Sequence, residues 1–309
     1  MKKIYIKLVV VAFIWGCTWI AGRIVAPHLS PLTSSALRFC LASICFVWIL
    51  TQQRLWVKPT LPTLGYLGLM GLIGVTAYNI CFFEGLRHIP ASRAALVVAT
   101  NPICALIAAH FIFKEPISGK GFLGILISLC GAVLVITQGH IERIWDGGIG
   151  VGEVIVFGCV VSWVGYTLLS KKVMRELSPL TASAYSTLIG TVMLVVLAVG
   201  NGGIDEIPTI PPDAWGALVY LGVVGAFLAY KWYFDGVKEI GPSSAALFIN
   251  LVPVFAVLMG VTVLGETVNV ASLIGGGCVI LGITLTLFKP PALKPIVPTD
   301  NTNAANKTP

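Results

Sequence analysis

The chain has 309 residues, of which 57% are hydrophobic and 11% are charged. A soluble domain usually carries about 25% charged residues, so this composition excludes an ordinary water-soluble protein and favours one that lipid surrounds. The net charge of +7 does not indicate nucleic-acid binding, because the basic residues stand in ones and twos between apolar runs and form no dense patch.

Ten apolar runs are long enough to cross a membrane as helices, which takes about 20 residues each. In chain order these predicted helices cover residues 6–26, 33–51, 64–86, 92–113, 120–138, 151–170, 180–199, 214–236, 243–264 and 268–288. Because hydrocarbon offers the backbone no hydrogen-bond partner, each run is expected to be helical whatever its content of β-branched residues. The Pro- and Asn-rich segment 289–309 is expected to be a disordered cytoplasmic tail. The predicted fold class is therefore an all-α integral membrane protein.

The basic residues predict how these helices are oriented. If both termini lie on one side of the membrane, the segments on that side hold 14 of the 20 Lys and Arg residues, and the loops on the other side hold three. The positive-inside rule then places both termini in the cytoplasm. We do not interpret the first apolar run as a cleaved signal peptide, because the second half of the chain contains its counterpart.

The second half of the sequence repeats the first. The segment Leu-Ser-Pro-Leu-Thr occurs at residues 29–33 and again at residues 177–181, 148 positions later, and an offset of 151 aligns residues 64–134 with the second half. The positions paired in this way include Gly71 and Gly222, Phe83 and Phe234, Pro102 and Pro253, and Gly131 and Gly282. We therefore expect two units, residues 1–138 and 151–288, joined by an outer loop at 139–150. Because each unit has five helices, the second is expected to be inverted in the membrane.

A known family shares this pattern. The features that carry the likeness are Trp15-Gly16 and Trp163 in the first helix of each unit, the repeated Leu-Ser-Pro-Leu-Thr, Ala36-Leu37-Arg38-Phe39, and Pro102 and Glu115 with Pro253 and Glu266. With them, residues 6–288 resemble two EamA domains of the drug/metabolite transporter superfamily. The resemblance implies a carrier of ten helices around a central cavity, and bacterial members are typically exporters of amino acids and other small metabolites. Tyr185-Ser186 replaces Leu37-Arg38 in the second unit, so an arginine role there is not two-fold symmetric.

The first candidates for substrate binding lie in two predicted helices that contain proline. Pro102 and Pro253 occupy matching positions in the fourth and ninth helices, and each removes one backbone donor and frees a carbonyl group one turn back. Paired, interrupted helices are typical of a transporter site, so Asn101 and Asn250 beside the breaks are predicted to line the cavity. The alternative is an ordinary kink that neighbouring helices stabilise.

Aromatic residues form a second group of candidates. Trp15 and Trp19 share one face of the first helix with Arg23, and Trp163 is the repeat counterpart of Trp15. Trp15 and Trp163 lie too near the middle of their helices to be anchors at the membrane surface, so cavity lining is favoured over helix packing. Tyr78, Asn79, Tyr166 and Tyr230 complete this group of aromatic and hydrogen-bonding candidates.

Two basic residues within helices are further candidates, since a charge in the membrane costs about 2.5–3.5 kcal/mol and normally faces the protein interior. Arg38 is predicted either to bind an anionic group such as a substrate carboxylate or to pair with Glu84, and we favour the pair. Lys231 either extends its ammonium group to the membrane surface, pairs with Asp235 one turn later, or contacts substrate.

The sequence contains no catalytic constellation and no Walker motif, and its eight cysteines and four histidines are scattered. We therefore predict no enzyme, no metal and no cofactor. Glu115 and Glu266 follow the fourth and ninth helices at matching places and are interpreted as helix caps or loop contacts. Deep acidic residues are scarce, which gives little support to proton coupling through a buried carboxylate.

The predicted function is a secondary transporter of the inner membrane that exports small metabolites, amino acids and aromatic ones among them, by rocking two units around a midplane cavity. Its partners would be a small-molecule substrate and membrane lipid, with H+ or a counter-substrate left open and no nucleic acid. The alternatives are an uptake permease for another class of metabolite, an intramembrane enzyme, and an assembly subunit without transport activity. An enzyme would need paired catalytic groups, and a subunit would not need a polar, Pro-broken interior.

Overall fold

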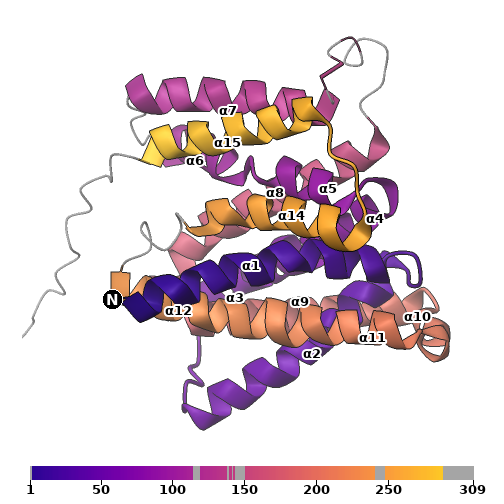
Figure 1. Cartoon of the computed structure of the whole chain (residues 1–309). Coiled ribbons are helices and arrows are strands. Elements are labelled where there is room, and N and C mark those ends of the chain that lie inside the picture. Colours follow the sequence, from indigo (N-terminus) through magenta and orange to yellow (C-terminus); the bar gives the residue numbers. More distant parts are fainter. Residues whose placement is uncertain are drawn as a thin grey trace, which may run out of the picture.

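The computed structural model of this chain describes residues 2–113, 119–137, 139–140, 142, 150–240 and 248–287. All regular elements in these residues are helical, and most lie along one common direction (Figure 1). In chain order they are α1 (Lys2–Val25), α2 (Pro31–Gln52), α3 (Leu61–Met70), η1 (Gly71–Ala77), α4 (Tyr78–His88), α5 (Ala91–Val98), α6 (Asn101–Phe113), α7 (Gly119–Thr137), α8 (Val151–Val173), α9 (Pro179–Gly200), α10 (Gly203–Glu206), η3 (Ile207–Thr209), α11 (Pro212–Val219), η4 (Tyr220–Leu228), α12 (Ala229–Ile240), η5 (Phe248–Leu251), α14 (Val252–Leu264) and α15 (Val270–Leu287). The predicted tail, Glu115 and most of the predicted outer loop lie outside the described residues.

Six helical segments in the described part of the chain are long and apolar enough to cross a membrane. They are Lys3–Val25, Pro31–Gln52, Leu61–His88, Val151–Ser170, Pro179–Gly200 and Pro212–Tyr233, and shorter apolar helices cover Gly119–Gly131, Val252–Leu264 and Val270–Gly282. These segments confirm the prediction of an all-helical membrane protein. A total of ten transmembrane helices stays a prediction.

Two of the long segments contain a stretch of π-helix. The stretch η1 separates α3 from α4, and η4 separates α11 from α12, at matching positions in the two halves of the sequence. Each stretch offers a backbone carbonyl group to a side chain: Asn79 Nδ2 donates to Val75 O at 2.7 Å, and Trp15 Nε1 donates to Gly225 O at 3.1 Å. Such stretches occur frequently at functional sites, and both lie beside residues that the sequence analysis selected.

The predicted fourth and ninth helices are interrupted where the prolines indicated. The helix α5 ends at Val98, and α6 begins at Asn101, directly before Pro102. In the second half, the short 3-10 helix η5 precedes α14, whose second residue is Pro253. Proline is tolerated in the first turn of a helix because its missing N–H would have no partner there, so a new helix begins at each proline.

The repeated Leu-Ser-Pro-Leu-Thr segments are two helix N-termini of the same design. The Oγ atom of Ser30 accepts the N–H of Thr33 at 3.3 Å, and that of Ser178 accepts the N–H of Thr181 at 3.2 Å. A proline follows each serine as the first residue of α2 and of α9. Serine at the cap and proline at the first helical position explain why this sequence begins a helix twice.

The helices α7 and α15 lie side by side at one edge of the bundle (Figure 1). Glycines permit this close approach, since a Cβ atom at Gly131 would lie 2.5 Å from the carbonyl oxygen of Gly275. The contact is reciprocal, because Gly282 packs in the same way against the carbonyl oxygen of Gly124. The partner position falls along α15 as the position rises along α7, so these two helices run antiparallel.

Reciprocal contacts of the same kind join the other helices of the bundle. Gly71 lies against the carbonyl oxygen of Ser186, and its sequence counterpart Gly222 lies against that of Arg38. Ser43 Oγ and Thr191 Oγ1, which are 148 positions apart, are hydrogen-bonded to each other at 2.8 Å. In these contacts, residues that the sequence offsets pair therefore meet partners that the offsets also pair.

Candidate functional site

Arg38 on α2 lies inside the bundle with 8% of its surface exposed. Its Nη1 donates a hydrogen bond to Asn79 Oδ1 on α4 at 3.0 Å. Its guanidinium carbon is 5.3 Å from the ring centroids of both Phe39 and Phe82. Its Nε is buried and has no hydrogen-bond partner in the described structure. One amide and two aromatic rings therefore hold the cation, which keeps donors available for another group.

The predicted ion pair between Arg38 and Glu84 is wrong. Glu84 instead pairs with Arg87 at 3.4 Å and with His88 at 3.0 Å, three and four residues later on the same helix. Side chains at that spacing meet on the helix surface, so Glu84 finds its partners locally at the end of α4. No carboxylate of the described residues lies within ion-pair distance of Arg38.

One tyrosine from each half of the chain lies near the guanidinium group. Tyr78 at the start of α4 and Tyr230 at the start of α12 both lie within electrostatic range of Arg38. Tyr230 also lies within range of Tyr166 on α8, whose hydroxyl oxygen is 3.4 Å from Ser183 Oγ. Two hydroxyl groups that can donate or accept therefore lie near a cation that has no described carboxylate within ion-pair distance.

Aromatic contacts extend from this centre in two directions. On one side the ring of Tyr78 lies 6.0 Å from Trp163, which stacks on Tyr166 at 5.6 Å. On the other side Trp15 on α1 lies 5.5 Å from Tyr230. These rings are partly exposed although they lie within the bundle. We name the group the arginine–aromatic cluster: Trp15, Arg38, Tyr78, Asn79, Trp163, Tyr166 and Tyr230.

Two residues that the sequence analysis did not select also belong to this region. Phe82 lies one turn after Tyr78 on α4 and is stacked on it at 6.4 Å. Tyr233 lies three residues after Tyr230 on α12 and contacts Trp15 at 5.4 Å. Phe82 and Tyr233 are counterparts at the 151-residue offset, so an aromatic residue at both repeat positions was the signal that could have found them.

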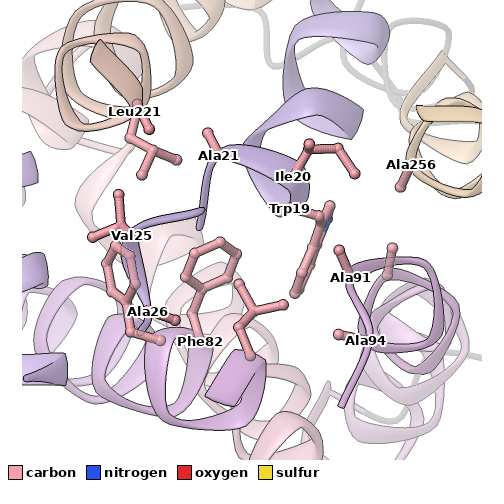
Figure 2. Packing of buried hydrophobic residues seen from close by; sticks show 14 of the residues in the cluster. Trp19, Ile20, Ala21, Val25, Ala26, Phe82, Ala91, Ala94, Leu221 and Ala256 are labelled. Atoms are coloured by element: carbon pink, nitrogen blue, oxygen red, sulfur yellow. The ribbon is translucent and has the colours of Figure 1, made fainter. Parts of the chain in front are cut away.

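Trp19 belongs to the apolar core. It is 3% exposed and lies 4.8 Å from the ring of Phe82. Figure 2 shows its ring between Phe82 and the alanines Ala91 and Ala94 of α5. We therefore leave Trp19 out of the candidate binding surface and assign it to the packing of α1 against α4 and α5.

The residues at the helix breaks are only partly described. Asn101 begins α6, and its Oδ1 atom is buried without a hydrogen-bond partner in the described structure. Pro253 is buried in the first turn of α14. The side chains of Pro102 and Asn250 lie outside the described set. A cavity role for these four residues stays a prediction.

Of the three alternatives for Lys231, the pair with Asp235 is not found. Asp235 pairs instead with Lys7 of α1 at 3.1 Å, which joins the beginning of the chain to α12. Lys231 is half-buried, and no described carboxylate lies within ion-pair distance of it. Its predicted contact with substrate stays open.

A polar cavity of about 300 Å³ lies apart from the cluster, beside the N-terminus of α5 and the segment between α14 and α15. Glu266 caps α5 there by accepting the backbone N–H groups of Ala91 at 2.8 Å and of Ser92 at 3.0 Å. The interpretation of Glu266 as a cap is confirmed. Arg93, which lines this cavity, pairs with the buried carboxylate of Glu153 at the start of α8. The described residues include no group of three or more His, Cys, Asp or Glu side chains that could hold a metal ion.

A protein-family model and several known proteins match most of the length of this chain. The sequence model of the EamA-like transporter family matches residues 2–137 and again residues 150–288. An uncharacterized transporter of Bacillus subtilis, YyaM, is 34% identical over 91% of this chain and 92% of its own length. An uncharacterized transporter of Archaeoglobus fulgidus is 26% identical over 93% of this chain and 98% of its own length.

Two further matches are another transporter and one solved structure. The uncharacterized inner membrane transporter YedA of Escherichia coli is 24% identical over 88% of this chain and 86% of its own length. One solved crystal structure matches with a TM-score of 0.62 and 19% identity, and the match covers 92% of this chain and 98% of the other. At that identity the likeness concerns the fold alone.

Proposed function

Because this chain belongs to the EamA-like transporter family, we propose that it is a secondary carrier that exports small metabolites by alternating access. The family and the apolar helices make it a multi-pass membrane transporter. The direction of transport, the substrate and the mechanism of transport are the parts that we propose. The resemblance suggests amino acids, aromatic ones included, as a first class of substrates to test.

One observation carries this proposal. The arginine–aromatic cluster gathers a buried cation, tyrosine hydroxyl groups and tryptophan rings from α1, α2, α4, α8 and α12. A few convergent polar groups among aromatic side chains are typical of a small-molecule site. Because the cluster takes residues from both halves of the sequence, a movement of one half against the other would open it alternately to the two sides of the membrane.

Reciprocal contacts support the idea that the two units are inverted. The antiparallel pairing of α7 with α15 is what an inverted repeat with an odd number of helices requires. The π-helical stretches η1 and η4, at matching positions beside the cluster, are candidate places for the bending that such a movement needs. Both termini would lie in the cytoplasm of a cell whose inner membrane holds the carrier, as the basic residues predict.

The test uses the purified full chain in liposomes and a panel of amino acids and aromatic carboxylates, with and without a pH gradient. We expect saturable counterflow of at least one compound. The substitution Trp163→Leu should reduce its rate by about tenfold, because aromatic pairs contribute on the order of 1.5 kcal/mol beyond burial and tenfold equals about 1.4 kcal/mol. The control is Trp48→Leu, since Trp48 is 58% exposed on α2.

The alternatives predict other results. A folded chain that gives no saturable transport of any compound would favour an assembly subunit. Inward accumulation under every gradient would favour an uptake permease. Equal rates for the Trp163 and Trp48 variants would remove the cluster from the site and leave the carrier itself in place.

A further inference from the structure

The acidic side chains that have a described ion pair or capping contact interact with groups other than Arg38. Glu84 pairs with Arg87 and His88, Glu153 with Arg93, and Asp235 with Lys7. Glu206 accepts the N–H of Ser30 at 2.7 Å, Glu266 caps α5, and Glu176 accepts the N–H of Thr60 at 2.8 Å. The centre of the bundle therefore has a cation, Arg38, and no described carboxylate beside it.

A buried guanidinium group without a counter-charge is an unusual arrangement. Taking one charge out of water without a partner is strongly unfavourable. The single amide of Asn79 is a neutral acceptor and compensates only part of this cost. The planar guanidinium fork matches a carboxylate, which accepts two parallel N–H bonds, and Arg38 still has a buried Nε without a partner.

We propose that the arginine–aromatic cluster binds an aromatic monocarboxylate anion in preference to a zwitterionic amino acid. The carboxylate would accept from the guanidinium group of Arg38, and the ring would lie among Tyr78, Trp163 and Trp15. A monoanion neutralises the site, whereas a zwitterion brings in an ammonium group and leaves the net charge at its former positive value. This inference names the substrate class of the function proposed above and rests on it.

The surroundings of Arg38 are unfavourable for an ammonium group. Such a group needs a carboxylate or the open face of an aromatic ring. No described carboxylate is within ion-pair distance of Arg38, and the rings of Phe39 and Phe82 already face the guanidinium group at 5.3 Å. An ammonium group bound next to the carboxylate would therefore lie near a like charge without an anion of its own.

The test measures binding to the purified full chain in nanodiscs at neutral pH by quenching of tryptophan fluorescence. Four probes share a phenylethyl frame and differ in charge: hydrocinnamate is an anion, L-phenylalanine a zwitterion, phenethylamine a cation and hydrocinnamamide neutral. We expect hydrocinnamate to bind at least about tenfold more tightly than any of the other three. Phenethylamine and hydrocinnamamide offer Arg38 no carboxylate for a charge-assisted hydrogen bond, and the ammonium group of L-phenylalanine would lie near the guanidinium group without an anion of its own.

Two variants separate the role of the charge from a role in folding. Asn79→Asp is nearly isosteric and places a carboxylate where Oδ1 now lies 3.0 Å from Arg38. It should abolish the preference for hydrocinnamate, because the new pair supplies the missing counter-ion, while the loss of the hydrogen bond from Asn79 Nδ2 to Val75 O lowers the melting temperature slightly. Arg38→Gln should also remove the preference. The control Arg87→Gln changes an exposed arginine that pairs with Glu84 and should leave the preference unchanged.

The outcomes distinguish this inference from the proposed function. If L-phenylalanine binds as tightly as hydrocinnamate, or if Asn79→Asp keeps the preference, the inference is overturned, and counterflow of amino acids would still support the carrier. If no probe binds and no compound is transported, both are overturned.

Discussion

At the scale of single residues, three glutamates stabilise helix N-termini that belong to distant parts of the chain. Glu206 accepts from the backbone of Ser30 before α2, Glu266 from the first two residues of α5, and Glu176 from Thr60 before α3. Each carboxylate lies where the first N–H groups of a helix have no partner within that helix, and where the helix dipole favours a negative charge. In all three cases a residue of the second half of the chain caps a helix of the first.

The Glu176 contact predicts a dependence of stability on pH. Hydrogen bonds from the side chains of Thr63 and Thr60 and from the Thr60 backbone lower the pKa of Glu176. A lowered pKa means that the folded chain binds the proton less tightly than the unfolded chain, so this stabilisation is present above the unfolded pKa and is lost as the pH falls through the lowered pKa.

We therefore expect Glu176→Gln to lower the melting temperature slightly at neutral pH, with the difference from the wild type disappearing in acid. Thermal unfolding of the purified chain over a pH series measures this. Glu239→Gln is the control, because Glu239 is exposed on α12. A difference that persists unchanged into acid would contradict the assignment.

At the scale of elements, small residues decide how closely the helices approach each other. In lipid, helices associate through close packing and not through release of apolar surface from water, so glycine at a contact matters more than the hydrophobicity around it. Gly282 of α15 meets the backbone of α7 at Gly124 and Ser128, whereas Gly277 of the same helix has nothing within 4 Å of a Cβ position. Gly282 therefore permits the close contact between α7 and α15, whereas Gly277 has no part in it.

This difference predicts opposite effects of the same substitution. Gly282→Ala should destabilise the protein by about 1–3 kcal/mol, because the added methyl group forces the two backbones apart. Gly277→Ala should be neutral or stabilising by up to about 1 kcal/mol, since alanine is the better helix former. Melting temperatures of both variants in the same detergent check this, and equal losses would show that α7 and α15 are not in close contact.

At the scale of the whole molecule, the proposed inversion puts equivalent loops on opposite sides of the membrane. His28 precedes the first copy of Leu-Ser-Pro-Leu-Thr, and its counterpart Glu176 precedes the second. We expect a cysteine introduced by His28→Cys to react with a membrane-impermeant maleimide in intact cells. A cysteine introduced by Glu176→Cys should react only after the membrane is opened.

Two more positions serve as matched controls for this labelling. Asn201→Cys should behave like His28→Cys, and Arg175→Cys like Glu176→Cys, because the predicted topology pairs them in that way. All four residues lie in turns between helices or at their ends. Labelling of positions 28 and 176 from the same side would contradict the inversion.

The sequence could predict the helical membrane fold because this depends on the surrounding solvent and on local chemistry. Low charge and long apolar runs need only lipid as solvent to become helices. The serine caps before Pro31 and Pro179 and the breaks before Pro102 and Pro253 follow from residues within one turn of each other. The model of the EamA-like transporter family matches the chain twice, over residues 2–137 and 150–288.

Ion-pair partners were the part that sequence reasoning predicted wrongly. The favoured pair of Arg38 with Glu84 was chosen by depth, and the alternative pair of Lys231 with Asp235 by helical spacing. In the structure Asp235 pairs with Lys7, 228 positions away, and Arg38 donates a hydrogen bond to Asn79. Whether two helices bring particular side chains within 4 Å depends on their separation and rotation, which a pattern along a single helix does not contain.

By itself, then, the sequence determined an all-helical membrane transporter with duplicated features, and it selected all seven members of the arginine–aromatic cluster as individual residues. Only the tertiary structure decided that Arg38 has an amide and aromatic rings near it and no described carboxylate within ion-pair distance, that Trp19 is core, and that Phe82 and Tyr233 lie beside the cluster. The physical reason is that helix formation in lipid is local, whereas the electrostatic environment of a buried charge is set by every helix that packs around it.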